Sequence, residues 1–520
     1  MVKYLSKSKL VAFRICPKRL WLEVNAPTER ADSATVEQSF KIGHEVGEIA
    51  QRLYDPNGKG ALVSIDALGF DGAFRHSKAL LTEAKPVTIF EAGFRAGGAL
   101  AFADIMIPTK PRSAATSWHM IEVKSATEKK AYHEDDVAIQ AYAALQSGVL
   151  LASVKLAHID KTWVYTGDGN YNGLFTEVDL TATALARQNE VATWVTDAHS
   201  FAAKTREPKH AMGKHCKEPF ECGYVAHCQS LLPAKAAAKF PVTWIPRVQT
   251  SALKNRIVAL AENAREPDMR NIEDKLLNDE QLRVKAVTMS GETHFDSAAS
   301  RKALRTSGKK PMFLDFETIN FAVPRWTGTR PRQQYVPFQF AANAINADGT
   351  LINFEFLDVS GDDPRPAMAR ALAKAFGGER AEAPVFAYNM SFERACLEHL
   401  AEAVPRHRAA MLGIAHRLDD LLPITRDHYY HPDQRGSWSI KSVLPTIAPE
   451  LDYAKLEGVQ HGQEAQEKYL EAIDPETTSE RKAQIESQLK AYCGLDSYAM
   501  VVLWAKLAGR KAPQLQRNGD

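Results

Sequence analysis

The sequence predicts an α/β protein of two principal domains, and three observations support this fold class. The chain has 520 residues, whereas an ordinary domain has about 100 to 200. Apolar residues make up 45% and charged residues 25% of the chain, as in globular proteins. Apolar strand patterns alternate with helical patterns in both halves. We predict domains over residues 1–235 and 306–520, with a mostly helical connector over 236–305.

The first domain begins with helices and continues as a sheet. Apolar residues show helical spacing in "SKSKLVAFRICPKRLWLEV", where Cys16 continues the pattern, and in "VEQSFKIGHEVGEIAQRLY". Strands are expected in "KPVTIFEAGFRAGGALAFADIMIP", with a turn at Gly97 and Gly98, and in "SWHMIEVKSAT". A helix in "EDDVAIQAYAALQSG" ends at Gly148. The stretch "HIDKTWVYTGDGNYNGLFTEVDL" predicts a hairpin, because its glycines have the spacing of neither phosphate-loop fingerprint.

The second domain follows the connector, which begins with "PAKAAAKFP", a stretch typical of a linker. Strands are expected at 311–317, in "YVPFQFAANAI" and in "LINFEFLDV", and Asp348 with Gly349 predicts a hairpin between the last two. A helix is expected in "RPAMARALAKAFG", a short strand in "PVFAY", and helices in "SFERACLEHLAEAV" and "ERKAQIESQLKAYCGLDSYAMVVLWAKLAG". This order of elements is that of an α/β domain.

The charge and hydropathy of the chain limit which nucleic-acid and membrane partners it can bind. The formal charge is only +2, so any nucleic-acid surface must be local. Two basic clusters permit phosphate binding or form solvated helix faces: Lys7, Lys9, Arg14, Lys18 and Arg19, and Arg301, Lys302, Arg305, Lys309 and Lys310. No apolar run approaches the roughly 18 residues of a membrane span, and the first residues lack the apolar core of a signal peptide. We therefore expect a cytoplasmic protein with no membrane partner.

Six cysteines are too few for a disulfide scaffold in a chain of this length. One stands alone and three lie six residues apart: Cys16, Cys216, Cys222 and Cys228. Four thiolates can hold a 4Fe-4S cluster or a tetrahedral zinc ion, and unligated thiols are the alternative. A bound cluster would tie the N-terminal helix to the end of the domain, as a clasp does.

A first set of acids lies on the predicted strands. Because side chains alternate along a strand, Glu122 and Lys124 point the same way, and Asp104 ends another strand, "ALAFADIMI". Acids that hold Mg2+ or Mn2+, together with a lysine that stabilises charge on a phosphate, suit a metal-dependent phosphodiesterase. The alternative is an exposed cross-strand ion pair.

The order Cys16, Asp104, Glu122, Lys124 and Gln140, followed by the three cysteines, resembles that of RecB-like nucleases of the PD-(D/E)XK superfamily. The likeness is to their iron-sulfur branch, which includes exonucleases of CRISPR adaptation and the AddB subunit of a helicase-nuclease. It implies a restriction-endonuclease-like fold in which the acids bind the metal and the lysine is catalytic. It also implies that the glutamine lies near the site and that the four cysteines hold a 4Fe-4S cluster.

Two further residues of the first domain are candidates. His44, in "KIGHEVGEIA", matches the helical metal-binding histidine of the branch, and a structural histidine on a helix face is the alternative. Glu91, in "IFEAGF", is a similar candidate for the active site. The chain departs from the branch in two respects. Gln140-Ala-Tyr142 replaces Gln-x-x-x-Tyr, so Tyr142 is not carried over, and the cysteine spacing is x5, x5 in place of x2, x5.

A second set of acids lies in the second domain. Asp315 and Glu317 share one face of the strand "FLDFETINF", and two buried carboxylates need a metal or a cationic partner. An exposed acidic strand edge is the alternative. Glu393 lies in the first turn of a helix, where an acid also interacts with the helix dipole. Tyr492 and Asp496 are four residues apart, hence on one helix face.

These motifs resemble those of the DnaQ-like DEDD exonucleases, which have the RNase H fold, in their tyrosine-containing subgroup. The resemblance implies a 3′ to 5′ exonuclease with two divalent metal ions. It also implies that Asp315, Glu317 and Asp496 bind the metals and that Tyr492 orients or deprotonates the attacking water.

The second resemblance leaves several positions open. Glu393 takes the place of the usual aspartate, its extra methylene changes its reach, and Asp419 or Asp420 in "RLDDLLPI" is the alternative. The stretch "SWSIKSVLP" resembles the helix start that follows in such exonucleases. There Ser439 would cap the helix, and Lys441 would either meet phosphate or be solvated.

Nearly the whole chain resembles an uncharacterised bacterial family that fuses an iron-sulfur RecB-like domain to an RNase H-like domain. We expect an enzyme with two nuclease sites that acts on nucleic acid, on DNA in preference to RNA, at single-stranded ends in repair, recombination or defence. The alternatives are an RNA-processing 3′ to 5′ exonuclease with an iron-sulfur nucleic-acid clamp, and a zinc-stapled scaffold without catalysis. The sequence has no helicase motif or P-loop, so a helicase or defence partner would have to separate strands.

Overall fold

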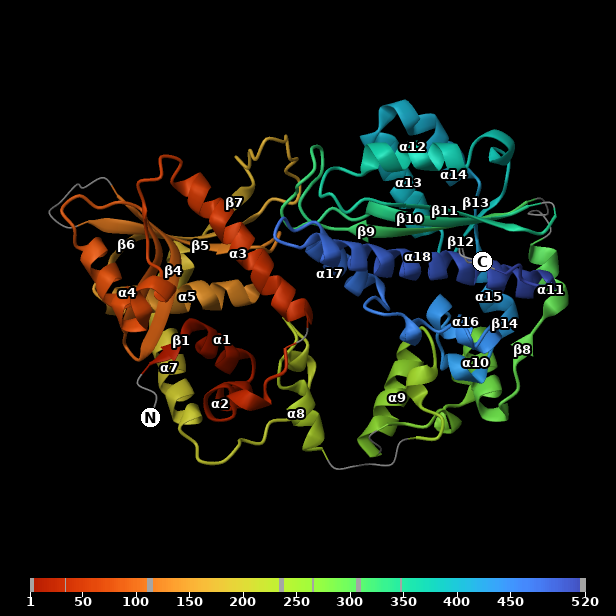
Figure 1. The fold of residues 1–520 in the computed structure, drawn as a ribbon. Helices are drawn as coiled ribbons and strands as arrows, with labels where there is room; N and C mark the ends of the chain where they lie inside the picture. The colour runs from red at the N-terminus through yellow and green to blue at the C-terminus, as the bar shows by residue number, and fades with distance from the viewer. Residues whose placement is uncertain are drawn as a thin grey trace. The chain divides into compact units, whose positions relative to one another are not determined.

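The computed structural model describes residues 4–32, 34–109, 116–232, 238–263, 266–304, 310–346 and 348–514. The chain forms two compact units (Figure 1). The first consists of Met1–Pro233 and Phe321–Arg332, and the second of Ala234–Asn320 and Gln333–Asp520, so the second includes the predicted connector. Several predictions fall outside the described residues: the boundaries at 235/236 and 305/306, residues 233–237 of the linker, and Arg305 and Lys309 of the second basic cluster.

The first unit is built on a mixed sheet of seven strands in the order β2-β3-β4-β5-β6-β7, with β1 paired to β4. Neighbouring strands are antiparallel except in the pairs β1/β4, β2/β3 and β5/β6. The strands are β1 (Leu5–Ser6), β2 (Ala61–Leu62), β3 (Ile89–Ala96), β4 (Ala99–Pro108), β5 (Ser117–Lys124), β6 (Leu150–Ile159) and β7 (Phe175–Asp179). The predicted turn at Gly97 and Gly98 is confirmed. β6 and β7 pair antiparallel, as the predicted hairpin requires, but residues 160–174 of that stretch form a loop outside both strands.

Helices cover both faces of this sheet. They are α1 (Lys7–Ile15), α2 (Pro17–Asn25), α3 (Ala34–Tyr54), α4 (Ile65–Leu81), α5 (Ala131–Gln146), α6 (Thr181–Ala186), α7 (Gln188–Ala202) and α8 (Val225–Ser230), with the 3-10 turns η1 (Pro27–Glu29) and η2 (Lys214–Cys216). Ile105 of β4 shares a core cluster with Ala50 of α3, whereas the next residue, Met106, lies in the cluster that contains Val137 of α5. Alternation along the strand therefore gives the sheet two apolar faces.

A single helix through Cys16 is a wrong prediction. The chain forms α1 and α2, with Cys16 between them in extended conformation (φ −154°, ψ 109°). Pro17 explains the break, because proline has no N–H to donate and disfavours helical backbone in the residue before it. Cys16 therefore stands at the junction of two helices.

A segment that follows β9 in the sequence, Phe321–Arg332, belongs to the first unit. Val323 is 1% exposed and shares a core cluster with Val46 of α3. The backbone N–H of Tyr165 donates to the carbonyl of Thr329 at 3.0 Å. The first unit thus takes part of its core from the second half of the sequence, which the predicted domain boundaries do not include.

The second unit contains a sheet of five strands in the order β11-β10-β9-β12-β13. β10 is antiparallel to both β9 and β11, while β12 is parallel to β9 and to β13. The strands are β9 (Met312–Ile319), β10 (Val336–Ile345), β11 (Leu351–Leu357), β12 (Val385–Ala387) and β13 (Leu418–Asp420), and a separate pair is formed by β8 (His294–Phe295) and β14 (Tyr429–Tyr430). The strands predicted here are confirmed, and so is the hairpin between β10 and β11, where Gly349 has a φ of 83°.

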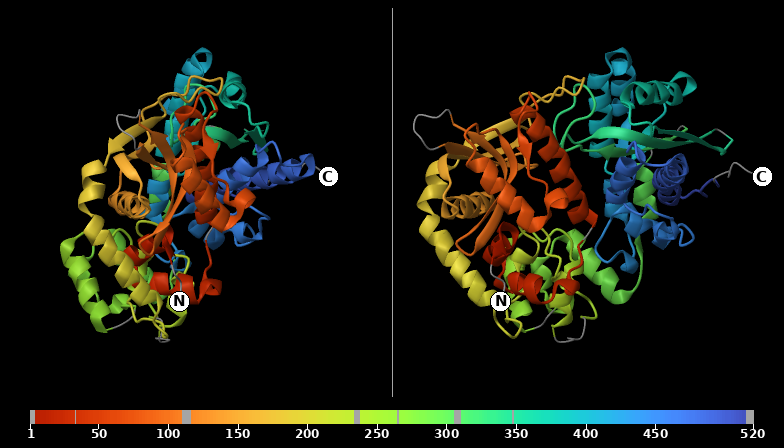
Figure 2. Two further views of the ribbon diagram at one scale, coloured as in Figure 1. Left: turned by 90° about the vertical axis from the view of Figure 1, so that its left-hand side faces the viewer. Right: turned by 60° about the vertical axis from the view of Figure 1, so that its left-hand side comes forward.

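Helices also lie on both sides of this second sheet. The helices of the second unit are α9 (Ser251–Asn263), α10 (Asp279–Ser290), α11 (Ser297–Ala303), α12 (Arg365–Ala375), α13 (Ser391–Ala403), α14 (Arg408–His416), α15 (Leu421–His428), α16 (Ile440–Ile447), α17 (Gly462–Ala472) and α18 (Ser479–Ala508). Figures 1 and 2 show α12 to α14, in cyan, and α18, in blue, on opposite sides of the green strands. The predicted connector contributes α9, α10 and short 3-10 turns. No helix in the described ranges combines the length and apolar character needed to cross a membrane.

Candidate metal centres and a cysteine pocket

Strand β9 directs two acids of the predicted second site to one face of its sheet. Leu314 and Phe316 lie in the core cluster with α12 to α14. The alternating residues Asp315 and Glu317 therefore face the other side, where α18 lies. The Cys493 sulfur on α18 is 3.5 Å from Asp315 Oδ2, and donor atoms of Asp315, Glu317 and Cys493 all lie within 4.8 Å of one another.

Four carboxyl groups of the predicted second site are brought together, and three of them are buried, whereas Asp315 is half-buried. Burial raises the pKa of Asp315 well above its usual range, and the charges of Asp496, Glu317 and Glu393 raise it further. Burial and the charge of Asp496 do the same to the pKa of Glu317. Burial, with Asp420 and Asp496, raises the pKa of Glu393 to about 8, and burial also raises that of Asp496. The predicted alternative of an exposed acidic strand edge is therefore wrong.

Three hydrogen-bond donors surround these acids. Tyr492 and Asp496 lie on α18, and Tyr453 donates to Asp496 Oδ1 at 2.6 Å. Lys441 Nζ donates to the phenolic oxygen of Tyr492 at 2.7 Å. Burial raises the pKa of Tyr492, and the charges of Asp496 and Glu317 raise it further. Both phenols are thus neutral donors within an acidic group.

Glu393 and Asp420 have different surroundings. Glu393 is 3% exposed, and its Oε2 has no hydrogen-bond partner in the part of the chain that the structure describes. Asp420 caps α15 by accepting from the backbone N–H of Leu422 at 2.9 Å, and it also accepts from that of Asn389 at 3.0 Å. Asp419 is exposed on β13. The Asp420 carboxylate is therefore occupied by backbone hydrogen bonds, whereas Glu393 has an oxygen that is available to a ligand.

The two residues expected at the start of α16 differ from their predictions in detail. Ser439 occupies the N-cap position, but its side chain makes no capping hydrogen bond. Lys441 is held by Tyr492 and by the carbonyl of Gln460 at 2.8 Å, so it is not the solvated lysine of the prediction.

Glu122 is the centre of the first predicted site and is 1% exposed. Its Oε1 accepts from Lys124 Nζ at 2.6 Å and from Lys7 Nζ at 2.7 Å. Its Oε2 accepts from the side-chain amide of Gln140 at 2.5 Å. Burial by itself would raise the pKa of Glu122, but the two lysines outweigh it and lower the pKa. The alternative of an exposed cross-strand pair is therefore wrong.

Asp104, Glu91 and His44 lie around Glu122. Asp104 lies inside β4, and not at its end as expected, and its Oδ2 accepts from the backbone N–H of Val123 at 2.6 Å. Burial raises the pKa of Asp104, and the charge of Glu122 raises it further. Burial and Glu122 raise the pKa of Glu91, whereas the charge of His44, exposed on α3, lowers it. The structure thus brings Asp104 and Glu91 within electrostatic range of Glu122 and of each other, and His44 within range of Glu91.

Tyr142 has a structural contact. Its hydroxyl donates to the carbonyl of Gly97 at 3.2 Å, at the turn between β3 and β4. This agrees with the departure from Gln-x-x-x-Tyr that set Tyr142 apart from the site residues.

Lys7 and Asp136 belong to the first site, although the sequence did not single them out as site residues. Lys7 Nζ lies 3.6 Å from Asp136 Oδ1, and Lys124 also pairs with Asp136. Asp136 precedes Gln140 by four residues on α5, so a shared helix face was a signal in the sequence. Lys7 had no such signal, because its contact with Glu122 joins residues far apart in the chain.

The first basic cluster is largely engaged inside the unit. Four of its five members form ion pairs: Lys7 with Glu122, Arg14 with Asp135 at 3.2 Å, Lys18 with Glu207 at 2.6 Å and Arg19 with Glu23 at 2.9 Å. Lys18 is buried and Lys7 and Arg19 are half-buried, so the alternative of a solvated helix face is wrong for these three, whereas Arg14 is exposed. In the second cluster, Arg301, Lys302 and Lys310 are exposed.

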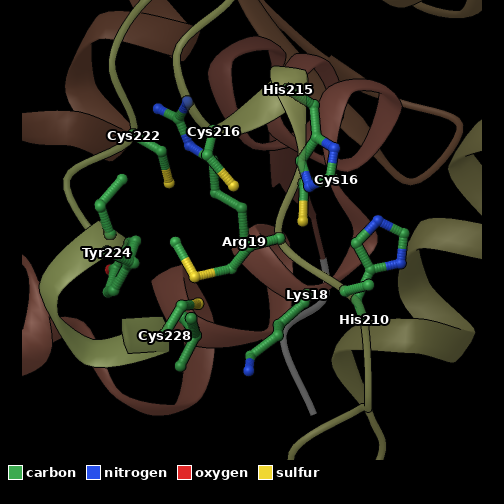
Figure 3. A pocket seen from close by; sticks show the side chains of 13 residues that line it. Cys16, Lys18, Arg19, His210, His215, Cys216, Cys222, Tyr224 and Cys228 are labelled. Atoms are coloured by element: carbon green, nitrogen blue, oxygen red, sulfur yellow. The ribbon is translucent and has the colours of Figure 1, made fainter. Parts of the chain in front are cut away.

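The four predicted cysteines line one pocket (Figure 3). Cys16 comes from the junction of α1 and α2, Cys216 from η2, Cys222 from the loop after it and Cys228 from α8. None of the four is in a disulfide bond. The pocket thus joins the first helices of the unit to its last helix, as the predicted clasp requires.

The chemistry of this pocket fits a 4Fe-4S cluster. Burial raises the pKa of Cys16 and Cys228, and the charges of Cys222 and Cys216 raise both further. Thiolates this close repel one another, and a metal centre would compensate their charge. Among the described residues, Cys16 is the one cysteine of the four that belongs to a group of three ligands within 4.8 Å.

The comparisons with known proteins concern part of the chain. Residues 312–439 match a family described as a domain of unknown function, DUF2779. No curated protein matches the chain. A solved structure described as "Crystal structure of SSO0001" is 15% identical, and the alignment covers 46% of this chain and 89% of that chain with a TM-score of 0.19.

Proposed function

We propose that this chain is a metal-dependent nuclease with two nuclease centres, which trims single-stranded DNA ends. The buried group of Asp315, Glu317, Glu393 and Asp496, with its raised pKa values, is the observation that carries the proposal. Four carboxylates this close repel one another, and Lys441 brings one positive charge. Hard divalent cations such as Mg2+ or Mn2+ are the partners that suit such oxygen ligands.

The chain's own residues would divide the work at the second centre. The four acids would hold the metal ions, which supply an activated water and support the leaving oxygen. Tyr492 would orient the water, because Lys441 fixes its phenolic oxygen at 2.7 Å. Tyr453 would hold Asp496 in place through its hydrogen bond of 2.6 Å. The contact with Lys441 would position the tyrosine before substrate arrives, and burial with the charges of Asp496 and Glu317 would keep it neutral.

At the first centre, Glu122, Asp104, Glu91 and His44 would hold the metal. Lys124 would stabilise charge on the attacked phosphate, and Lys7 would keep the Glu122 carboxylate ionised in its buried position. Gln140 would fix the orientation of that carboxylate through its hydrogen bond. The cysteine pocket would hold a 4Fe-4S cluster that joins the first and last helices of the unit.

The order of the strands supports the two proposed folds. In the second unit the sheet order is β11-β10-β9-β12-β13, which is 3-2-1-4-5 when the strands are numbered along the chain from β9. The second of these strands, β10, is antiparallel to β9, and this topology supports an RNase H-like fold. In the first unit, the acids lie on adjacent antiparallel strands of a mixed sheet followed by α5, which supports a restriction-endonuclease-like fold. We propose DNA repair, recombination or defence as the setting, in the cytoplasm, with a helicase or defence partner.

A nuclease assay tests the proposal. Wild type, Lys124→Ala, Asp315→Ala and the double variant are compared on end-labelled single-stranded DNA and RNA with Mg2+ or Mn2+. We expect Asp315→Ala to lose 3′ trimming and the double variant to lose the remaining products. Glu398→Ala, exposed on α13, is the matched acid control and should behave as wild type. Unchanged 3′ trimming by Asp315→Ala would refute the second centre.

The second candidate is an RNA-processing 3′ to 5′ exonuclease whose first unit is an iron-sulfur clamp for nucleic acid. The ion pairs of Glu122 with Lys7 and Lys124 favour it, because they balance the charge of Glu122 without a metal. If Lys124→Ala changes no product and RNA is trimmed faster than DNA, this candidate replaces the first.

A further inference from the structure

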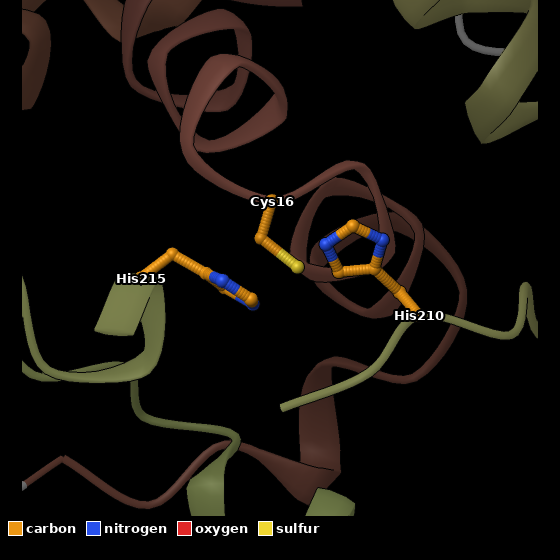
Figure 4. Close-up of side chains that lie close together, drawn as sticks. All are labelled: Cys16, His210 and His215. Atoms are coloured by element: carbon orange, nitrogen blue, oxygen red, sulfur yellow. The ribbon is translucent and has the colours of Figure 1, made fainter. Parts of the chain in front are cut away.

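We infer that Cys16, His210 and His215 form a site for a single divalent metal ion of the zinc class. The Cys16 sulfur and a ring nitrogen of each histidine all lie within 4.8 Å of one another. Figure 4 shows the Cys16 side chain between the two imidazole rings, whose centroids are 5.0 Å apart. Neither histidine is among the site residues predicted from the sequence, although both lie close to Cys216 in "KHAMGKHC".

The donor set and its spacing suit zinc. Zinc binds cysteine sulfur at about 2.3 Å and histidine nitrogen at about 2.0 to 2.1 Å, so the ligand atoms of a tetrahedral ion are about 3.3 to 3.8 Å apart. The three donors lie within 4.8 Å of one another, so small side-chain movements would bring them to that separation. His210 is exposed and His215 half-buried, so both rings can turn by a small angle without disturbing the core. Three protein ligands leave the fourth position to water.

The new site shares one ligand with the proposed 4Fe-4S cluster. Both centres need the Cys16 thiolate, and the thiol proton passes to solvent when either centre forms. Zinc and cluster would therefore exclude each other, a consequence that rests on the proposed cluster. With zinc bound, Cys216, Cys222 and Cys228 would remain free thiols.

Cobalt titration of the full-length, metal-free protein under anaerobic conditions tests the site. We expect the absorption of a tetrahedral Co2+ ion with the charge-transfer intensity of one thiolate. The double variant His210→Ala/His215→Ala should bind Co2+ at least about tenfold more weakly, and Cys16→Ser should lose the charge-transfer band. Cys222→Ser should bind as wild type does.

A matched control separates ligation from local unfolding. His227 lies on α8 beside Cys228, but it pairs with Glu207 at 3.1 Å. His227→Ala should therefore bind Co2+ normally. Three results would each overturn the site. They are an unchanged affinity for Co2+ in the histidine double variant, loss of Co2+ binding in Cys222→Ser, and equally weakened binding in His227→Ala.

A second measurement does not depend on the histidine variants. In the zinc-loaded protein, mass spectrometry after alkylation should find Cys16 protected and Cys216, Cys222 and Cys228 modified. Protection of all four would place the ion on the cysteines alone and overturn the proposal. Neither measurement uses nuclease activity, so inactive protein would refute the proposed function and leave this site untouched.

Discussion

The ammonium group of Lys441 donates a hydrogen bond to the phenolic oxygen of Tyr492, with 2.7 Å between the two atoms. The same nitrogen donates to the carbonyl of Gln460 at 2.8 Å. Burial raises the pKa of both Glu317 and Asp496, and the charge of Lys441 acts in the opposite direction on both. One lysine therefore positions the tyrosine and favours the ionised form of two acids.

Lys441→Met removes this charge and retains most of the side-chain volume. Without it, Glu317 and Asp496 stay protonated to a higher pH, because their pKa values rise further. We expect the acid limb of the pH profile of kcat/KM for 3′ trimming to move up by about 1 pH unit, and the apparent affinity for Mn2+ to fall about tenfold.

The matched control for Lys441 is Lys490→Met. Lys490 precedes Tyr492 on α18 and pairs with Glu486 at 2.8 Å on the helix surface. Its removal should leave the pH profile in place. If Lys441→Met shows the wild-type profile, the assigned role of Lys441 is wrong.

Raised acid pKa values make the metal-free protein less stable as the pH rises. The pKa of Glu393 is about 8 in the folded protein, and that of an unfolded glutamate is about 4.3. Between these values the folded state binds more protons, so the free energy of unfolding falls with rising pH. This contribution is fully present below about pH 4 and is lost as the pH passes about 8, on the order of a few kcal/mol.

Calorimetry with EDTA and with Mn2+ measures this effect. Without metal, the midpoint temperature of thermal unfolding should be lower at about pH 8 than at about pH 5. Mn2+ should raise this temperature more at the higher pH, where the acids are ionised. Asp315→Asn should reduce both effects, because it removes one of the repelling charges. Equal stabilisation by Mn2+ at both pH values would contradict the buried acidic site.

Glu393→Gln separates the two roles of this side chain. The change removes a buried charge whose Oε2 has no hydrogen-bond partner in the described ranges. We expect the metal-free variant to be more stable than wild type at pH 9, by about 1 to 3 kcal/mol. Trimming should fall at least about 100-fold, because a metal ligand is lost. Both are measured with Glu398→Gln, exposed on the same helix, as the control.

If Glu393→Gln trimmed DNA as fast as wild type, we would assign the metal-binding role to Asp420 in place of Glu393. That outcome would require Asp420 to release the backbone N–H of Asn389 or Leu422.

Val323→Ala tests how much the first unit depends on the segment 321–332. Val323 is 1% exposed and packs with Val46 and Leu174. Removing two buried methyl groups should lower the free energy of unfolding by about 1 to 3 kcal/mol. The measurement is a urea titration, with Val164→Ala as the control, because Val164 is 40% exposed. Equal stability of wild type and Val323→Ala would show that the segment adds nothing to the core.

The sequence predicted the elements that carry the acids, because their physical signals are local. Alternating apolar residues indicated β9, and the run "FLDFETINF" placed Asp315 and Glu317 on one face. The spacing of Tyr492 and Asp496 required no more than one helix. The helix break at Cys16 also had a local signal in the sequence, because Pro17 excludes a continuous helix. The helical spacing of the apolar residues outweighed that signal in the prediction.

Contacts between distant segments could not be predicted in the same way. Lys7 appeared to belong to a surface cluster, because nothing in its neighbourhood indicates a contact with Glu122. Tyr453 lies in a stretch with weak periodicity, so its bond to Asp496 had no signal. The segment 321–332 joins the first unit through packing with residues more than a hundred positions earlier, which domain boundaries drawn from composition do not detect.

The most direct test of the central claim is the product pattern from 5′-end-labelled single-stranded DNA with Mn2+, for wild type and Asp315→Asn. Wild type should give a ladder shortened from the 3′ end, and Asp315→Asn or EDTA should abolish it. The proposed second centre would be contradicted if Asp315→Asn gave the same ladder. The proposed nuclease activity would be contradicted if DNA and RNA stayed intact after incubation with wild type and either Mn2+ or Mg2+.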